Sequence, residues 1–321
     1  MLTIGNLTLP LPFLLAPMAG ISDLPFRLIS RVFGAPLAFT EMIDVTALRH
    51  KDKRTRRMLT STPDDRPLGI QLVGSSGEDI LKALDVLDSY EYDLLDFNAA
   101  CPTPKITRKG KGAALLREPL KLRELLTILV DHAQVPVTVK IRAGWDADSV
   151  NAREIALCAE DAGISALFIH GRTKAQGYSG TVDYRVIKEV KDALNIPVIA
   201  SGDNISVSLM RKMFGETGCD GIAIARGSLG NPWIFQEATQ YFEDGVHSKR
   251  PDMNERINVM KNHLYLSIQH YGERKGVAVF HKFFIWYTRG LLNIRSLRDK
   301  ALRSDTKKEL IDVIEDLRTL E

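Results

Sequence analysis

Cys101 lies at a point in the chain where a chemically active side chain could be placed. It follows the apolar segment LLDFN at 94–98 and precedes the basic segment KITRKGK at 105–111. Because Pro102 cannot continue a strand, the thiol falls at the start of a loop. There it can serve as a general acid, as a nucleophile or as a small buried apolar group, and its neighbours leave all three open.

Two further polar residues, Lys140 and His170, end apolar segments. Lys140 is near the end of VTVKI at 137–141, and His170 closes ALFIH at 166–170. A buried lysine without a partner is costly, so its ammonium is expected to be ion-paired or to meet a negatively charged ligand. A flavin meets this requirement. His170 is either a core histidine or a site residue, and its glycine-rich continuation HGRTKAQGYSG favours the site.

Two glycine-containing turns are typical of phosphate-binding loops. SGDN at 201–204 and ARGSLGNPW at 225–233 follow consecutive apolar segments. Glycine lets backbone N–H groups approach an anion closely, and barrels often bind phosphate after their last two strands. Either turn alone could be an ordinary tight turn, but the pair favours phosphate.

Basic residues gather in two runs near these turns. RHKDKRTRR at 49–57 contains six Lys or Arg and one acidic residue, and the run at 105–111 contains no acidic residue. Each run alone is compatible with a solvated surface. Together, beside turns that could be catalytic, they favour a polyanionic partner.

The polar residues follow apolar segments that recur along the first two-thirds of the chain. The eight segments are 13–17, 36–41, 68–73, 94–98, 137–141, 166–170, 197–201 and 221–225. Each is followed by turn residues and a helical pattern, and examples of the helical pattern are 80–90, 120–133 and 150–163. Strands that are apolar throughout are typical of a parallel sheet covered on both faces. The pattern predicts an α/β fold, a (β/α)8 TIM barrel, with functional residues at the C-terminal ends of its strands.

The pattern changes near residue 240. Residues 1–240 are predicted to form the barrel and residues 241–321 a helical domain, with helices at 255–271, 277–292 and 305–320. Residues 241–300 contain eleven Lys or Arg against six Asp or Glu. This excess of positive charge suits contact with RNA.

The composition excludes several classes of protein. The chain has 321 residues, 45% of them hydrophobic, and a net charge of +3, which is ordinary for a globular protein. It shows neither a secretory signal nor a stretch of about 20 apolar residues. Cys158 and Cys219 fit packing positions, so neither a disulfide framework nor a metal site is expected. We predict a cytoplasmic protein that is a monomer, with no membrane contact and no protein partner.

Eight motifs in the same order resemble those of the tRNA-dihydrouridine synthases, most closely their bacterial B-type branch. They are APMAGISDLPFR, TEM, the spacing RP..IQL.GS at 66–75, DFNAACP with its KITRKGKGAALL tail, VKIRAGW, HGRTKAQGYSG, SGD and ARGSLGNPWIF. The similarity runs from about Leu11 to Phe235. It implies a TIM barrel that holds FMN, uses NADPH or NADH as electron donor, and reduces the C5=C6 bond of uridine in tRNA.

The resemblance also implies roles for individual residues. Cys101 would be the general acid that gives a proton to C5 of the uracil. FMN would be bound by Pro17, Met18, Ala19, Gln71, Lys140, His170, Gly202, Asp203, Ala225 and Arg226. The RNA substrate would be bound by Asn98, Lys105, Arg108, Lys109 and Arg172.

Four positions depart from the family pattern. Ala100 precedes the cysteine where glycine is usual, Ser201 replaces asparagine, and Ala225 replaces glycine. In the helical domain, His281-Lys282-Phe283 replaces Arg-Lys-His. The first three changes would alter the flavin site slightly, and the fourth would remove a charge that could contact RNA.

Three other functions remain compatible with the sequence. One is an FMN-dependent TIM-barrel oxidoreductase that acts on a small activated alkene, and another is a dihydrouridine synthase that acts on ribosomal RNA. The third is an RNA-binding protein on a degenerate barrel, without enzymatic activity. The basic runs and the helical domain favour RNA over a small substrate.

Overall fold

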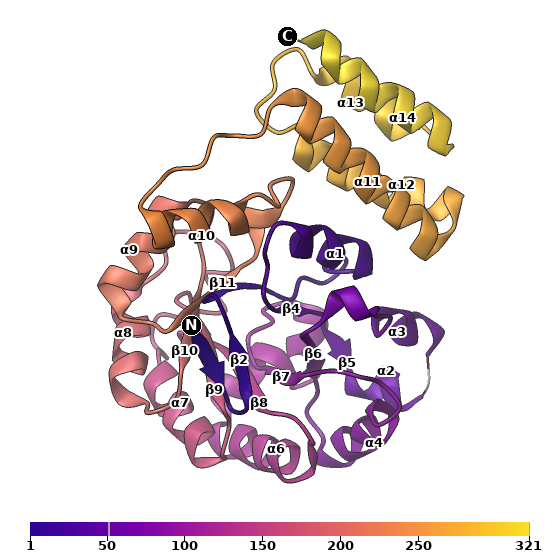
Figure 1. Ribbon diagram of the computed structural model, residues 1–321. Coiled ribbons are helices and arrows are strands. Elements are labelled where there is room, and N and C mark those ends of the chain that lie inside the picture. Colours follow the sequence, from indigo (N-terminus) through magenta and orange to yellow (C-terminus); the bar gives the residue numbers. More distant parts are fainter. Residues whose placement is uncertain (51, 321) are drawn as a thin grey trace.

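The fold is a closed parallel barrel with a layer of helices around it (Figure 1). A computed structural model describes residues 1–50 and 52–320, so Lys51 of the basic run at 49–57 and Glu321 lie outside the described residues. Pairing follows the chain order, and the first strand closes the barrel against the last. The strands are β3 (Phe13–Leu15), β4 (Ala38–Phe39) with β5 (Ile43–Asp44), β6 (Leu68–Val73), β7 (Leu94–Asn98), β8 (Val137–Arg142), β9 (Ala166–His170), β10 (Val198–Ser201) and β11 (Gly221–Ile224). The predicted (β/α)8 barrel is confirmed.

The second strand of the barrel is divided, unlike its predicted continuous segment, 36–41. It consists of two short pieces, and both pair with β6: Ala38 lies opposite Leu68, whereas Ile43 lies opposite Leu72. One extra residue therefore separates the two pieces, as in a β-bulge. The bulge contains Thr40, Glu41 and Met42, and a continuous apolar segment does not reveal it.

Helices cover the outside of the barrel between successive strands. Side-chain caps begin several of them; Ser76 accepts the N–H of Asp79 at α4, and Ser206 accepts the N–H of Leu209 at α9. The α-helices are α1 (Leu24–Val32), α2 (Val45–Arg49), α3 (Lys53–Met58), α4 (Gly77–Leu87), α5 (Pro104–Thr107), α6 (Pro119–His132), α7 (Ala152–Asp161), α8 (Tyr184–Ala193), α9 (Val207–Thr217) and α10 (Ile234–Asp244). Short 3₁₀ helices span η1 (Pro63–Asp65), η2 (Gly112–Arg117) and η3 (Arg226–Ser228).

The interior of the barrel is apolar at one end. Inward-facing residues such as Leu14, Leu94 and Phe168 form one buried cluster with residues of an N-terminal hairpin, β1 (Leu2–Ile4) and β2 (Leu7–Leu9). The hairpin was not predicted, because two three-residue strands carry too little periodicity. It fills the bottom of the barrel, so polar residues inside are confined to the opposite end.

A group of helices follows the barrel and packs on its α1 side (Figure 1). It comprises α11 (Met253–Tyr271), α12 (Glu273–Tyr287), α13 (Arg295–Arg303), α14 (Lys307–Glu315) and η4 (Asp316–Leu320). The predicted boundary at residue 240 falls within α10, and α13 was not predicted. No helix in the described part of the chain combines the length and the apolar character that crossing a bilayer requires.

The helical domain and the barrel share one apolar core. Phe283 of α12 is fully buried and stacks on Phe26 of α1 with ring centroids 5.6 Å apart. Close approach is also required at Gly230, where a Cβ would lie 2.2 Å from the backbone of Trp286. The departure from the family pattern at position 283 therefore affects packing between the domains. From the sequence, the loss of a charge that could contact RNA had been expected there.

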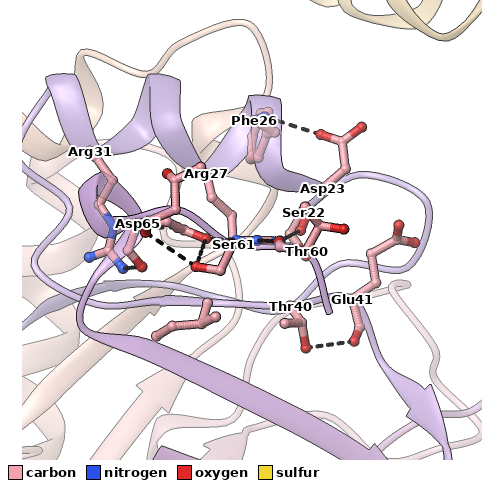
Figure 2. Close-up of polar contacts among 12 residues, drawn as sticks. Ser22, Asp23, Phe26, Arg27, Arg31, Thr40, Glu41, Thr60, Ser61 and Asp65 are labelled. Carbon is pink, nitrogen blue, oxygen red and sulfur yellow. Dashed lines mark hydrogen bonds and ion pairs between the residues drawn. The ribbon is translucent and has the colours of Figure 1, made fainter. Parts of the chain in front are cut away.

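One buried ion pair joins α1 to the loop before β6 (Figure 2). The guanidinium of Arg27 donates through Nε and Nη2 to one carboxylate oxygen of Asp65, at 2.9 and 2.7 Å. Its remaining donors reach the carbonyls of Ser22 at 2.9 Å and Thr60 at 2.8 Å. Both charged side chains are almost inaccessible to solvent. Arg27 therefore connects α1 and the loop before it to the segment between α3 and β6.

We predict that Asp65→Ala lowers the free energy of unfolding by about 3–5 kcal/mol, because it leaves a buried guanidinium without its counter-ion. Urea denaturation measures the loss. Asp312→Ala, which breaks an exposed ion pair with Lys308, is the control and should leave stability unchanged. Equal stability of the two variants would show that the buried pair contributes nothing.

Candidate active site

A cavity of about 460 Å³ opens at the C-terminal ends of the barrel strands. Strand alternation explains its lining, because every second residue of a barrel strand points inward. The residues predicted from the sequence to meet FMN or uracil that line it are Pro17, Met18, Ala19, Gln71, Asn98, Cys101, Lys140, His170, Gly202, Asp203, Ala225 and Arg226. Residues far apart in the chain thus converge on one site.

A chain of hydrogen bonds between strands runs below the cavity. The side-chain amide of Asn98 donates to Gln71 at 2.8 Å, and that of Gln71 donates to Asp96 at 2.7 Å. The other oxygen of Asp96 accepts from the hydroxyl of Thr138 at 2.7 Å. Each of these buried side chains therefore has a hydrogen-bond partner, and the network holds Asn98 and Gln71 in fixed orientations.

Burial shifts the protonation of two groups in this layer. It lowers the pKa of the Lys140 ammonium to about 8 and raises the pKa of the Asp96 carboxyl to about 7. The pKa of about 8 for Lys140 includes the effect of the nearby cation of Arg142, which also lowers it, and of Asp96, which raises it. The nearest hydrogen-bond partner of the Lys140 ammonium is the hydroxyl of Ser201, at 3.4 Å. The site can therefore accept an anionic group beside Lys140.

The peptide that carries Cys101 is held by neighbouring strand ends. The side-chain oxygen of Asn98 accepts the N–H groups of Ala100 at 3.0 Å and Cys101 at 2.8 Å. Arg142 donates to the carbonyl of Ala100 at 2.7 Å. The thiol itself is half-buried and lies 3.4 Å from the hydroxyl of Thr103. A rigid backbone thus presents the sulfur to the cavity.

His170 is held neutral by its surroundings. Burial, together with the nearby cations Lys140, Arg142 and Arg172, lowers the pKa of its imidazole to about 2. A neutral ring can both donate and accept a hydrogen bond. His170 is therefore able to bind a polar ligand edge, but it adds no charge to the site.

The turns after β10 and β11 form a cradle of free backbone N–H groups. A Cβ at Gly202 would lie 2.6 Å from the His170 ring, and a Cβ at Gly227 would lie 2.3 Å from the carbonyl oxygen of Asn204, so both positions need glycine. None of the hydrogen bonds found among the described residues uses the amide N–H of Asp203, Asn204, Arg226 or Gly227 as donor. Unpaired amides at two adjacent turns fit a phosphate group.

Arg172 does not line the cavity. Its guanidinium is buried and already engaged: it forms two hydrogen bonds with the carboxylate of Asp203, at 3.0 and 2.6 Å, and bonds the carbonyls of Ser179 and Gly180. Asp203 also accepts from Arg226 at 3.0 Å. The structure therefore places Arg172 behind the turn that follows β10, bonded to Asp203. The sequence had instead predicted that Arg172 contacts the RNA substrate.

The basic residues after Cys101 divide into two kinds. Lys105, Arg108 and Lys109 are exposed on α5 and the turn after it, beside the cavity but outside its lining. Lys111, which belongs to the same run, is buried and donates to both oxygens of Asp44 at 2.7 and 2.9 Å. The first three remain available to an external anion, whereas Lys111 stabilises the barrel.

Asp96 and Tyr178 are among the residues of the site that were not predicted from the sequence. Asp96 completes the hydrogen-bond chain, and its place two residues before Asn98 on one strand is the signal that could have identified it. Tyr178 lines the cavity mouth with its ring 4.7 Å from the guanidinium carbon of Arg226. It lies within the glycine-rich segment HGRTKAQGYSG, in which the sequence points to His170 and Arg172 but not to the tyrosine.

Comparison with known proteins agrees with this geometry. A family model described as dihydrouridine synthase (Dus) matches residues 14–320. The tRNA-dihydrouridine synthase B of Pasteurella multocida (strain Pm70) is 38% identical over 288 residues, which are 90% of this chain and 87% of that protein. The protein of the same name from Pseudomonas aeruginosa PAO1 is 37% identical over 311 residues, 97% of this chain and 94% of that protein.

Solved structures of similar fold support the barrel. Histamine dehydrogenase from Rhizobium sp. 4-9 matches 83% of this chain and 50% of its own, with a TM-score of 0.56 and 15% identity. At that identity the match concerns the fold alone. The resemblance drawn from the sequence motifs is confirmed by the family match: the chain belongs to the dihydrouridine synthase family and is a flavin-dependent oxidoreductase.

Proposed function

We propose that this protein is a tRNA-dihydrouridine synthase that uses FMN and NADPH to reduce the C5=C6 bond of uridine, with Cys101 as the proton donor. The observation that carries the proposal is the convergence of Cys101, Asn98 and Lys140 on one cavity that also contains free backbone amides. FMN, when bound, would take a hydride from NADPH and pass it to C6 of the uracil.

The residues of the cavity suit the parts of FMN. The amides at Asp203 and Gly227 would hold the phosphate, whose charge the nearby Arg226 would balance. Lys140 would lie beside the ring system and stabilise negative charge there. His170, neutral in this site, would hydrogen-bond the ring edge without repelling Lys140.

Cys101 would supply the proton. Addition of a hydride to C6 places an electron pair at C5, and the S–H bond of Cys101 breaks as the C5–H bond forms. Asn98 fixes the backbone of Cys101 through two hydrogen bonds, so the sulfur keeps one position at the cavity mouth. Solvent can return a proton to the half-buried thiolate after the reaction.

The exposed cations would hold the RNA. A uracil in folded RNA must leave its stack to reach the bottom of a barrel mouth, and the flanking phosphates then need partners. Lys105, Arg108 and Lys109 lie on the same segment as Cys101, a few residues further along the chain. This arrangement favours RNA over a small alkene as the substrate.

We predict that Cys101→Ala lowers dihydrouridine formation by about 10²- to 10⁴-fold, the usual cost of losing a positioned general acid. FMN binding and reduction of the flavin by NADPH should survive, because neither requires the thiol. Stopped-flow oxidation of the reduced protein by tRNA measures the effect. Cys158→Ala, on the outer helix α7, is the matched control. A Cys101→Ala protein that oxidises as fast as wild type would contradict the proton-donor role.

We predict that Lys140→Met weakens retention of FMN and flattens its dependence on pH. Because the pKa of Lys140 lies near 8, its charge is present at pH 7 and lost as pH rises through 8. Ionisation of Asp96 above about pH 7 acts in the same direction, since it adds negative charge. Wild-type affinity for FMN should therefore fall between pH 7 and 9. Fluorescence titration at both pH values tests this, with Lys174→Met outside the cavity as control; equal slopes for wild type and Lys140→Met would refute it.

We predict that replacing Lys105, Arg108 and Lys109 by glutamine weakens tRNA binding. The slope of the logarithm of the binding constant against the logarithm of the salt concentration should become shallower by up to about one for each lost phosphate contact. Reduction of FMN by NADPH should not change, because it needs no RNA. A triple substitution of Lys82, Lys188 and Lys212, on outer helices of the barrel, removes the same charge elsewhere. Similar binding by both triple variants would place the RNA elsewhere.

The substrate itself can be identified in a deletion strain. Mapping dihydrouridine across its transfer and ribosomal RNA shows which positions lose the modification. Loss at tRNA positions supports the proposal, and loss confined to ribosomal RNA would replace the substrate while keeping the reaction. Wild-type protein that shows no flavin absorbance even after reconstitution with FMN would refute the proposed function as a whole.

A further inference from the structure

A second cavity, of about 400 Å³, lies between the barrel and the helical domain and is lined by residues of both. Its barrel side includes Gly20, Asp23 and Glu41, and its helical side includes Tyr271 and Lys282. Gly20 and Asp23 belong to the loop of residues 17–23 between β3 and α1. The first residues of this loop, 17–19, line the first cavity. One short loop therefore borders both cavities.

Both polar groups of the Gly20 backbone are held from outside the loop. The ammonium of Lys282, on α12, donates to the carbonyl oxygen of Gly20. The N–H of Gly20 donates to the carboxylate of Glu41, which belongs to the bulge between β4 and β5. Gly20 has a positive φ of 71° and no neighbouring atom within 4 Å of a Cβ position. Within the loop, the N–H groups of Ile21 and Ser22 donate to the carbonyl of Met18, at 3.0 Å each, and close a turn around Gly20. The two hydrogen bonds of Gly20 attach this turn to the bulge and to the helical domain.

The end of the loop is attached to the helical domain as well. The hydroxyl of Tyr271 donates to the carboxylate of Asp23 at 2.9 Å, and Asp23 also accepts the N–H of Phe26 at the start of α1. On the other side of the loop, the guanidinium of Arg27 donates to the carbonyl of Ser22 as well as to Asp65 (Figure 2). The Ser22 hydroxyl in turn accepts the N–H of Met18 at 3.0 Å. Contacts at Gly20 and Asp23 are thus linked to Met18 through one hydrogen-bonded turn.

We propose that Lys282, with Tyr271 in support, is a positioning residue of the cofactor site: the helical domain holds loop 17–23 in the conformation that places Met18 and Ala19 against the flavin. The identity of the ligand rests on the function proposed above, whereas the anchoring of the loop does not. A loop held in its binding conformation before the ligand arrives loses less entropy on binding. The helical domain then contributes to cofactor affinity in addition to any contact with RNA.

The main experiment compares two lysines of α12. Lys282→Met should raise the dissociation constant for FMN of the apo protein by about tenfold, because the loop is no longer preorganised. Lys282→Arg, which keeps a cationic donor, should restore most of the affinity. Lys275→Met is the matched control: Lys275 lines the same cavity and lies 4.8 Å from the centroid of the Tyr271 ring, but it does not bond Gly20. It should change the affinity by less than about twofold, since it leaves the loop's own bonds intact.

Hydrogen exchange of the apo protein tests the anchoring without FMN. The amides of residues 17–23 should exchange faster in Lys282→Met than in wild type, and not in Lys275→Met. Tyr271→Phe removes a single hydroxyl and provides a second variant if Lys282→Met does not fold. It should speed exchange at the Asp23 end of the loop.

Two outcomes would overturn the proposal. One is unchanged exchange and FMN affinity in both Lys282→Met and Tyr271→Phe. The other is an equal effect of Lys282→Met and Lys275→Met, which would indicate the general charge of the cavity instead of a bond to Gly20. If wild-type protein binds no FMN, the proposed function fails, and the exchange data still decide whether the helical domain holds the loop.

Discussion

Every second residue of a strand in a closed parallel barrel must point into the barrel, and whatever lies there must be packed or hydrogen-bonded. In this protein the inward-facing side chains form two layers, one at each end of the barrel. At the bottom, apolar side chains and the N-terminal hairpin exclude water. At the top, Gln71, Asp96 and Asn98 satisfy one another across neighbouring strands. The position of Cys101 follows from this layer, because Asn98 holds the peptide that carries the thiol.

The same layer explains the charge balance of the site. Arg172 and Arg226 share the carboxylate of Asp203, and Arg142 donates to backbone carbonyls, so three guanidiniums are engaged by the protein itself. Lys140 lies beside a serine hydroxyl instead. Burial of its ammonium is costly, and an anionic ligand would reduce that cost. The site thus combines fixed cations that shape the loops with one whose charge favours a ligand.

The loop of residues 17–23 shows how the two domains depend on each other. On one side the buried pair of Arg27 and Asp65 holds Ser22, and on the other side Tyr271 and Lys282 reach Asp23 and Gly20. Stacking of Phe26 on Phe283 keeps these partners at a constant separation. The shared core is therefore also what aligns the polar contacts between the domains.

The strands and the residues at their ends could be predicted from the sequence, because apolar segments and strand alternation are local properties of the chain. That is why Asn98, Cys101, Lys140 and His170 could be predicted as neighbours and lie around one cavity. Which cations are free depends on how the chain folds. Lys111 resembles Lys109 in the sequence, but the carboxylate of Asp44, 67 residues away, binds its ammonium. Arg172 and Arg226 both bind the carboxylate of Asp203, which is 31 and 23 residues away. The bulge at Glu41 and the bond from Lys282 to Gly20, across 262 residues, were equally hidden, since such contacts depend on how separate segments meet in space and leave no periodic pattern in the chain.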